Sequence, residues 1–313
     1  MEEFMKKIGR ALFCAACLSL LAASLYAAPK AKAPKDIWVA KEKNGMLVTT
    51  DANGWAQVNF GEEVDLSGYK YLQVECSSPD GKKFSHVELY FGFVPEENED
   101  YDWDQSAKIR IYGIQKKPAL YQGVIYSSIM CYEHWENGKK IYRTPEKAAA
   151  DNFSISVYDA NWKNIPNIKI FVKKVTATNN AIGQLHVIDY SKARFFAINN
   201  SVTWDNDGSK HYAYWADLQQ ALGTTPKAGD IVQLKLKGTN AYDLGNFRAI
   251  VFDDSGEWQQ VSLECNGRGF AKGQKVNDTI DLPIIKNGSK MTLEISTFED
   301  ESEFKGPYLI YSK

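Results

Sequence analysis

The fold is decided by two neighbouring stretches of sequence, "HVELYFGF" (86–93) and "AKIRIYG" (107–113). In both stretches apolar and polar residues alternate with a period of two, which is typical of a β-strand with one buried face. The face predicted to be buried holds Val87, Leu89, Phe91, Phe93, Ile109 and Ile111. The opposite face holds Glu88, Tyr90, Gly92, Lys108, Arg110 and Tyr112. We therefore expect two strands of an antiparallel sheet, each with a core face and an outward face.

The same alternation, rich in β-branched and aromatic residues, recurs along the rest of the chain. In the first half the further segments are "YKYLQVEC" (69–76), "GVIYSSIMC" (123–131), "FSISVYD" (153–159) and "NIKIFVKKV" (167–175). In the second half they are "ARFFAIN" (193–199), "HYAYWAD" (211–217), "IVQLKLKG" (231–238), "NFRAIVF" (246–252), "EWQQVSL" (257–263) and "MTLEIST" (291–297). Only "TPEKAAADN" (144–152) and "ADLQQALG" (216–223) predict short helices. Many short strands with little helix predict an all-β chain of two tandem antiparallel β-sandwiches, jelly-roll-like in architecture.

A polar, turn-rich interruption, "VTATNNAIGQ" (175–184), separates the two sets of strands and predicts the boundary between them. The expected organisation is a signal peptide over 1–28, a flexible leader over 29–36, a first sandwich over 37–178, a linker over 179–184 and a second sandwich over 185–313.

The first residues predict export. Lys6, Lys7 and Arg10 precede an apolar run (11–25) that ends in small residues and Pro29, the pattern of a cleaved signal peptide. A transmembrane helix needs about 20 apolar residues, and this run is shorter. We expect a protein of the periplasm, the cell surface or the extracellular medium with no transmembrane span. Lipid attachment at Cys17 is the alternative.

Charge and cysteine content narrow the classes of partner. Removing the predicted signal peptide leaves 34 basic and 37 acidic residues, a formal charge of −3, which argues against nucleic-acid binding. Three cysteines remain, Cys76, Cys131 and Cys265. A disulfide between Cys76 and Cys131 and buried free thiols are both compatible with this count, and we expect buried thiols.

Several strand phrases of the chain resemble one known class of domain. "VDLSGYKYLQVEC" (64–76) with "IKIFVKKVTA" (168–177) resembles the opening and closing strands of jelly-roll carbohydrate-binding modules in secreted bacterial proteins. "ADLQQALGTTPKAGDIVQLKLKGT" (216–239) with "FRAIVFDDSGEWQQVS" (247–262) is similar to another version of the same module. This resemblance implies a sugar-binding face, often with a structural calcium ion, and it includes no catalytic signature.

The outward faces of the predicted strands hold residues suited to sugars. Aromatic rings stack on the apolar faces of carbohydrate, and Tyr and Trp add a polar group. The candidate ligand-binding residues are Glu88, Tyr90, Arg110 and Tyr112 in the first half, and Tyr212, Tyr214, Arg248, Trp258 and Gln260 in the second. We expect Ser262 to share the face of Trp258 and Gln260, with Val261 and Leu263 in the core. Cross-strand aromatic pairs on a half-exposed sheet are the structural alternative.

The loop between the two opening strands is strongly acidic. Asp100, Asp102 and Asp104 have the spacing that starts a calcium-binding loop, but Gln105 and Ile111 stand where an EF-hand needs Gly and Glu. Tyr101 and Trp103 lie between these acids. We expect a ligand-binding lip that adds Tyr101 and Trp103 to the candidate residues; a solvated loop and a non-EF calcium site are the alternatives.

Catalysis has little support in the sequence. The common nucleophile, zinc-protease and nucleotide-binding motifs are absent, and the four histidines have no ligand spacing. We expect a non-catalytic glycan-binding protein whose partner is a polysaccharide or a cell-surface glycan. A structural or adhesive protein that binds other proteins, and a small polysaccharide-active enzyme, are the two alternatives.

Overall fold

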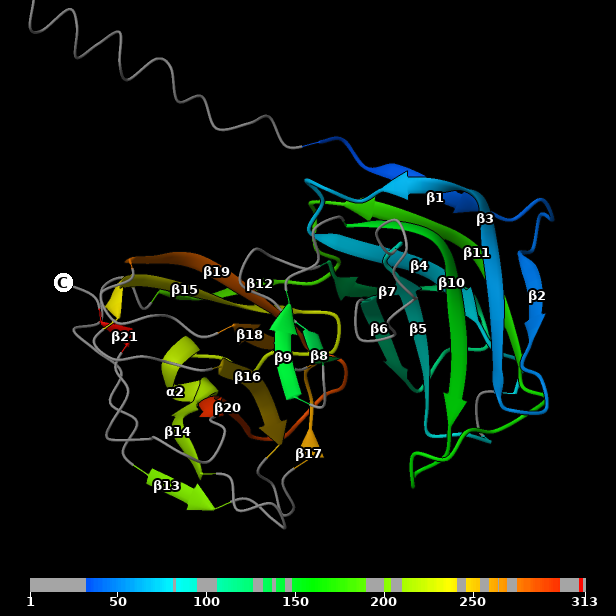
Figure 1. Ribbon diagram of the computed structural model, residues 1–313. Helices are drawn as coiled ribbons and strands as arrows, with labels where there is room; N and C mark the ends of the chain where they lie inside the picture. The colour runs from blue at the N-terminus through cyan, green and yellow to red at the C-terminus, as the bar shows by residue number, and fades with distance from the viewer. Residues whose placement is uncertain are drawn as a thin grey trace, which may run out of the picture. The chain divides into compact units, whose positions relative to one another are not determined.

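The computed structural model describes residues 32–80, 83–94, 106–125, 132–136, 139–143, 148–189, 200–203, 210–240, 246–253, 259–263, 265–268, 275–298 and 310–311. Residues 33–313 form one compact unit. The described elements are strands with one short helix, so the predicted all-β class is confirmed (Figure 1).

Two antiparallel sheets are built from the first half of the chain. The first has the order β1-β11-β4-β7, with β2 also pairing β11. Its strands are β1 (Lys35–Val39), β2 (Met46–Thr49), β4 (Tyr71–Ser77), β7 (Ala119–Val124) and β11 (Lys169–Thr178). The second has the order β3-β10-β5-β6. Its strands are β3 (Trp55–Asp65), β5 (His86–Gly92), β6 (Ser106–Tyr112) and β10 (Ala149–Tyr158).

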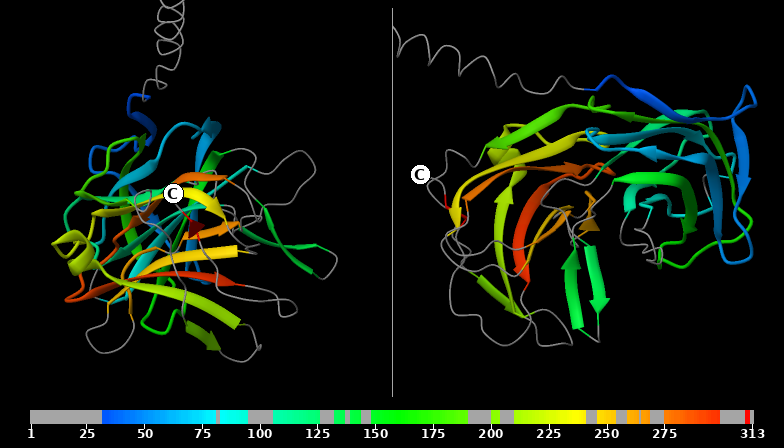
Figure 2. Two further views of the ribbon diagram at one scale, coloured as in Figure 1. Left: turned by 90° about the vertical axis from the view of Figure 1, so that its left-hand side faces the viewer. Right: turned by 45° about the horizontal axis from the view of Figure 1, so that its top comes forward.

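The core of this half lies between these two sheets, whose blue-to-green strands can be followed in the right-hand view of Figure 2. Alternate residues of β4 and β11, such as Val74 and Val172, pack in one hydrophobic cluster with Leu89, Phe91 and Phe153 from β5 and β10. The predicted core face of "HVELYFGF" is confirmed, because Val87, Leu89, Phe91 and Phe93 are all at most 1% exposed. The arrangement is that of a β-sandwich.

The second half contributes two further sheets. One has the order β12-β15-β19, with β21 pairing β15, and the other has the order β13-β14-β20-β16-β17, with β18 pairing β16. The first contains β12 (Leu185–Asp189), β15 (Ile231–Asn240), β19 (Lys275–Pro283) and β21 (Ile310–Tyr311). The second contains β13 (Asn200–Thr203), β14 (Lys210–Asp217), β16 (Asn246–Asp253), β17 (Gln259–Gln260), β18 (Cys265–Arg268) and β20 (Met291–Phe298). A separate hairpin joins β8 (Tyr132–Glu136) to β9 (Lys139–Arg143).

The helix predicted near residue 216 is confirmed as α2 (Leu218–Leu222). Asp217 caps its start, because the carboxylate accepts a hydrogen bond from the Gln220 N–H. Gly223 ends it in the left-handed conformation, with its N–H bonded to the Gln219 carbonyl.

The structure corrects three expectations. The helix predicted over 144–152 is wrong for residues 149–152, which belong to β10. Ala149 and Ala150 are fully buried in that strand, so tertiary packing overrides their helix propensity. Pairing of β12 with β15 is parallel, which the antiparallel prediction did not include. Ser262, which we expected on the outward face, is fully buried, and its hydroxyl accepts a hydrogen bond from the Val251 N–H. The N–H groups of Val261 and Ser262 both donate to the Val251 carbonyl, and two consecutive donors to one carbonyl form a β-bulge at the end of the strand.

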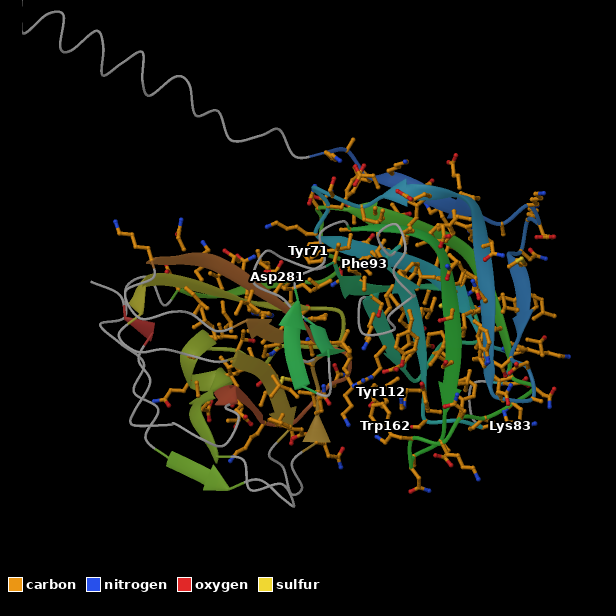
Figure 3. All side chains as sticks on the ribbon, viewed as in Figure 1. Tyr71, Lys83, Phe93, Tyr112, Trp162 and Asp281 are labelled. Carbon is orange, nitrogen blue, oxygen red and sulfur yellow. The ribbon has the colours of Figure 1, made fainter. Side chains whose placement is uncertain are left out.

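Hydrogen bonds connect the two halves across the predicted boundary. The Tyr71 hydroxyl of β4 donates to Asp281 of β19 at 2.7 Å, and Gln233 of β15 donates to the other Asp281 oxygen at 2.7 Å (Figure 3). Gln122 of β7 donates to the Gly229 carbonyl and accepts from the Ile182 N–H. The division at 179–184 stays a prediction, and β1 already begins at Lys35, inside the predicted leader.

Two further expectations concern cysteines and membranes. Cys76 is a free thiol with 1% exposure, and burial raises its pKa; Cys131 lies outside the described residues. Among the described residues, we find no helix long and apolar enough to cross a membrane.

Candidate functional site

The outward face of the β3-β10-β5-β6 sheet carries a grid of polar and aromatic residues. Strand pairing aligns Ser154 with Tyr90 and Lys108 in one row across β10, β5 and β6. The next row aligns Trp55 of β3 with Ser156, Glu88 and Arg110. A third row aligns Tyr158, His86 and Tyr112. Paired residues on neighbouring strands point to the same side of the sheet, so the side chains of all three rows lie on one surface.

A pocket of about 370 Å³ opens on this surface. Its lining combines three aromatic rings with hydroxyl, amide and ammonium groups: Trp55, Tyr90, Lys108, Ser154, Ser156, Tyr158 and Asn164. The volume lies within the range of about 300–1,000 Å³ that is usual for small-molecule sites. The aromatic rings offer stacking surfaces, and the polar groups offer directional hydrogen bonds.

Tyr90 occupies a fixed position in the pocket wall. Its hydroxyl donates to the Glu88 carboxylate and lies 3.3 Å from the Tyr158 hydroxyl. Glu88 is itself buried and forms an ion pair with Arg110 on the next strand. The Tyr158 hydroxyl is protonated and able to donate at neutral pH, and burial raises its pKa further. Glu88 and Arg110, in the neighbouring row on the same face, thus hold the Tyr90 hydroxyl in place.

Ser154 is a buried polar residue of the lining whose side chain has no hydrogen-bond partner among described residues. Its exposed fraction is 2%. A buried hydroxyl without a partner costs about 1–3 kcal/mol. Such a group in a pocket wall is a ready contact for a ligand that carries hydroxyl or acid oxygens.

An aromatic cluster borders the pocket around His86. The His86 ring lies 5.0 Å from the rings of Tyr112 and Tyr158 and 4.5 Å from that of Trp162. Figure 3 shows Tyr112 and Trp162 at the same end of the sheet. Burial, with a contribution from the Arg110 charge, lowers the pKa of His86 to about 4, so the ring is neutral at physiological pH. Trp162 is 51% exposed and stacks on the Arg110 guanidinium, 4.6 Å from the ring centre.

Two tight turns deliver the residues at the pocket rim. In "DANG" (51–54), Asp51 accepts hydrogen bonds from the N–H groups of Asn53 and Trp55, which fixes the start of β3. In the loop after β10, Asp159 accepts from the N–H groups of Asn161 and Lys163, and the loop returns the chain to Asn164.

The two turns meet at Gly54. The Asn164 side chain donates to the Asn53 carbonyl at 3.2 Å, and a Cβ atom on Gly54 would stand 2.7 Å from the Asn164 Cβ. Gly54 also has a φ of +81°, which other residues rarely adopt. Glycine at this position is therefore what allows Asn164 to reach the pocket.

The structure brings together the candidate residues of the first half that it describes. Glu88, Tyr90, Arg110 and Tyr112 share the outward face, as the alternation predicted, but only Tyr90 lines the pocket. Tyr112 packs on His86 and lies under the Lys286 ammonium, 5.2 Å from its ring centre. Tyr101, Trp103 and the proposed calcium ligands Asp100, Asp102 and Asp104 lie outside the described residues.

The candidates of the second half do not form a described pocket. Tyr212 and Tyr214 lie on β14 opposite Thr297 and Ile295 of β20, and Arg248 lies on β16 opposite Ser296; their side chains are outside the described part. Gln260 pairs with Phe252 and is half-buried. Trp258 lies outside the described residues.

Sequence reasoning missed most of the lining: Trp55, Lys108, Ser154, Ser156, Tyr158 and Asn164. A signal existed for three of them, because alternation in "FSISVYD" sets Ser154, Ser156 and Tyr158 opposite the buried Phe153, Ile155 and Val157. Lys108 was placed on the outward face without being assigned to a site. Trp55 gave a weaker signal, since β3 contains Gly61 and consecutive acids that obscure its alternation.

Comparison with known proteins does not assign this chain to a family. No family model and no curated protein matches the chain. Among solved structures, the chain is similar to the glycoside hydrolase domain of Endo-D from Streptococcus pneumoniae R6, with 11% identity, a TM-score of 0.27, and coverage of 88% of this chain and 37% of that one.

Two further solved structures are similar over most of their length. The tandem CBM22 domain from Paenibacillus barcinonensis has 12% identity and a TM-score of 0.23, covering 90% of this chain and 97% of that one. A putative secreted protein from Parabacteroides distasonis ATCC 8503 has 7% identity and a TM-score of 0.19, covering 88% and 85%. Similarity at this level does not carry a ligand or an activity over to this chain.

Proposed function

We propose that this protein is an exported, non-catalytic glycan-binding protein, and that its site is the pocket on the β3-β10-β5-β6 sheet. The observation that carries the proposal is the lining itself. Trp55, Tyr90 and Tyr158 supply ring surfaces, while Ser154 and Asn164 supply hydrogen-bonding groups around the same open hollow. A sugar ring presents apolar C–H faces and a periphery of hydroxyls, which is the complement of this combination.

Export is the second part of the proposal, and its support is in the first residues. The basic start and the apolar run of residues 11–25 have the pattern of a signal peptide. Binding would then take place in the periplasm, at the cell surface or outside the cell, where polysaccharides are accessible.

The test is a screen of polysaccharides by affinity gel electrophoresis, followed by titration calorimetry of any ligand found, with protein that begins at residue 29. Trp55→Ala should weaken binding about tenfold, because it removes the stacking surface at the pocket rim. Trp55→Phe should restore most of the affinity, because it returns an aromatic face. Tyr121→Ala, on the other sheet, is the control and should bind like the wild type.

Ser154→Ala separates ligand binding from folding. Loss of an unsatisfied buried hydroxyl should leave the melting temperature equal or higher, while affinity falls by a few-fold. Repeating the titrations in EDTA tests the calcium site predicted at Asp100, Asp102 and Asp104. If a bound calcium ion shapes the binding site, its removal by EDTA should weaken binding. If no polysaccharide binds, the proposal is wrong and a protein partner becomes the better hypothesis.

A further inference from the structure

Lys108 is the charged residue among the described residues that line the pocket. It lies on β6 directly opposite Tyr90 of β5, and its ammonium nitrogen stands 5.5 Å from the centre of the Tyr90 ring. Within the described part of the chain, no carboxylate forms an ion pair with it. The Lys108 ammonium therefore brings a positive charge to the pocket that described residues do not balance.

Arg110, two residues further on the same face, has a different environment. Its guanidinium is paired with the buried Glu88 carboxylate and covered by the ring of Trp162. The charges of Arg110 and Glu88 cancel, so they contribute little to the field at the pocket. Lys108, Arg110 and Glu88 together carry a net charge of +1, and this charge is on Lys108, the one of the three that lines the pocket.

The neutral groups around Lys108 are suited to an anion. The Ser154 hydroxyl is in the same row of the sheet and has no hydrogen-bond partner among described residues. The Tyr158 hydroxyl, a donor at neutral pH, also lines the pocket. Hydrogen bonds between such donors and an ionised acceptor are about twice as strong as those between neutral groups.

We propose that the pocket binds an anionic sugar, whose carboxylate or sulfate pairs with Lys108 and accepts a hydrogen bond from Ser154. This inference rests on the proposed glycan-binding function and specifies the chemical class of the ligand. The sugar ring lies against Trp55 and Tyr90, and the acid group is directed to the β6 side of the pocket.

The test compares polysaccharides that differ only in charge. Polygalacturonate is paired with its methyl ester, and dextran sulfate is paired with dextran, each titrated into the protein by calorimetry at low and at high salt. The acidic member of at least one pair should bind about tenfold more tightly than its neutral partner, and added salt should reduce that ratio. The pair with the larger ratio identifies the acid group as carboxylate or sulfate.

Variants at Lys108 assign the preference to the pocket. Lys108→Gln should abolish the preference, while Lys108→Arg should keep most of it. Lys117→Gln, which neutralises an exposed lysine outside the pocket, is the matched control and should leave the preference intact.

Each result is decisive. Equal binding of acidic and neutral polymers overturns the inference but leaves the proposed function standing. A preference that survives Lys108→Gln also overturns it, because a cationic group other than Lys108 would then carry the preference. If neither member of either pair binds, while other glycans do, this inference alone is wrong. If no glycan of any kind binds, the proposed function is also wrong.

Discussion

At the scale of single residues, His86 shows how a polar residue becomes part of an aromatic core. It is 1% exposed, and the ring nitrogen Nε2 has no hydrogen-bond partner among described residues. Rings of Tyr112, Tyr158 and Trp162 surround it, and the Arg110 charge disfavours its protonated form. A neutral imidazole fits this environment, whereas a charged one would be removed from water and would lie near the like charge of Arg110.

His86 should therefore make stability depend on pH. Its pKa is about 4 in the folded protein, against the ordinary histidine value of 6.5 that applies to the unfolded chain. Between these values only the unfolded chain takes up the proton, so stability falls as the pH falls from 6.5 to 4. The loss attributable to His86 is up to about 3 kcal/mol at pH 4. Urea unfolding at a series of pH values measures it.

His86→Phe is the matched variant for this prediction, because it keeps an aromatic ring without a titrating group. Glu88 and Arg110 face His86 and remain in both proteins, so the difference between the two pH profiles isolates the histidine. Parallel profiles for wild type and variant would show that His86 does not carry the effect.

At the scale of elements, the pocket depends on two turns that meet at Gly54. Gly54→Ala should lower the free energy of unfolding by about 1–2 kcal/mol through backbone strain at positive φ. It should also weaken glycan binding, because the new Cβ would push Asn164 away from the pocket rim. Chemical denaturation and calorimetric titration measure the two effects separately.

Gly61→Ala provides the control for this pair of effects. Gly61 lies on the same strand with a φ of +89°, but a Cβ atom there would meet nothing within 4 Å. It should show the stability loss without the loss of binding. If both variants bind the glycan equally well, the contact between Gly54 and Asn164 does not shape the pocket.

At the scale of the whole molecule, the buried hydrogen bonds at Asp281 link strands of both halves. Tyr71 and Gln233 each donate to one oxygen of its carboxylate, and all three residues are at most 8% exposed. Burial, and then the Asp281 charge, raises the pKa of the Tyr71 hydroxyl, which therefore remains a donor over the accessible pH range. Such a carboxylate depends on its donors, because burial has removed it from water.

Tyr71→Phe should destabilise the protein by about 1–3 kcal/mol, since one Asp281 oxygen loses its donor in a buried site. Tyr121→Phe is the control, because the hydroxyl lost there accepts a bond from the Gln115 N–H at an exposed position. Urea midpoints followed by tryptophan fluorescence compare the two. Equal midpoint shifts would contradict a special role for the buried pair.

The sequence alone determined the all-β class, the positions of strands such as β4, β11 and β16, and the division of β5 and β6 into core and outward faces. Those features follow from the local alternation of apolar and polar residues, because successive side chains of a strand point to opposite faces of the sheet. It also determined α2, whose capping residues Asp217 and Gly223 are adjacent to the helix they end.

Only the tertiary structure decided which outward residues meet. Trp55, Tyr90, Ser154 and Asn164 come from three different strands and a loop, and pairing of β10 with both β3 and β5 places them together. It also decided that residues 149–152 form a strand and that Ser262 is buried, since long-range pairing and packing outweigh local propensity. Register between distant strands is a property of the whole sheet, so no local pattern of residues specifies it.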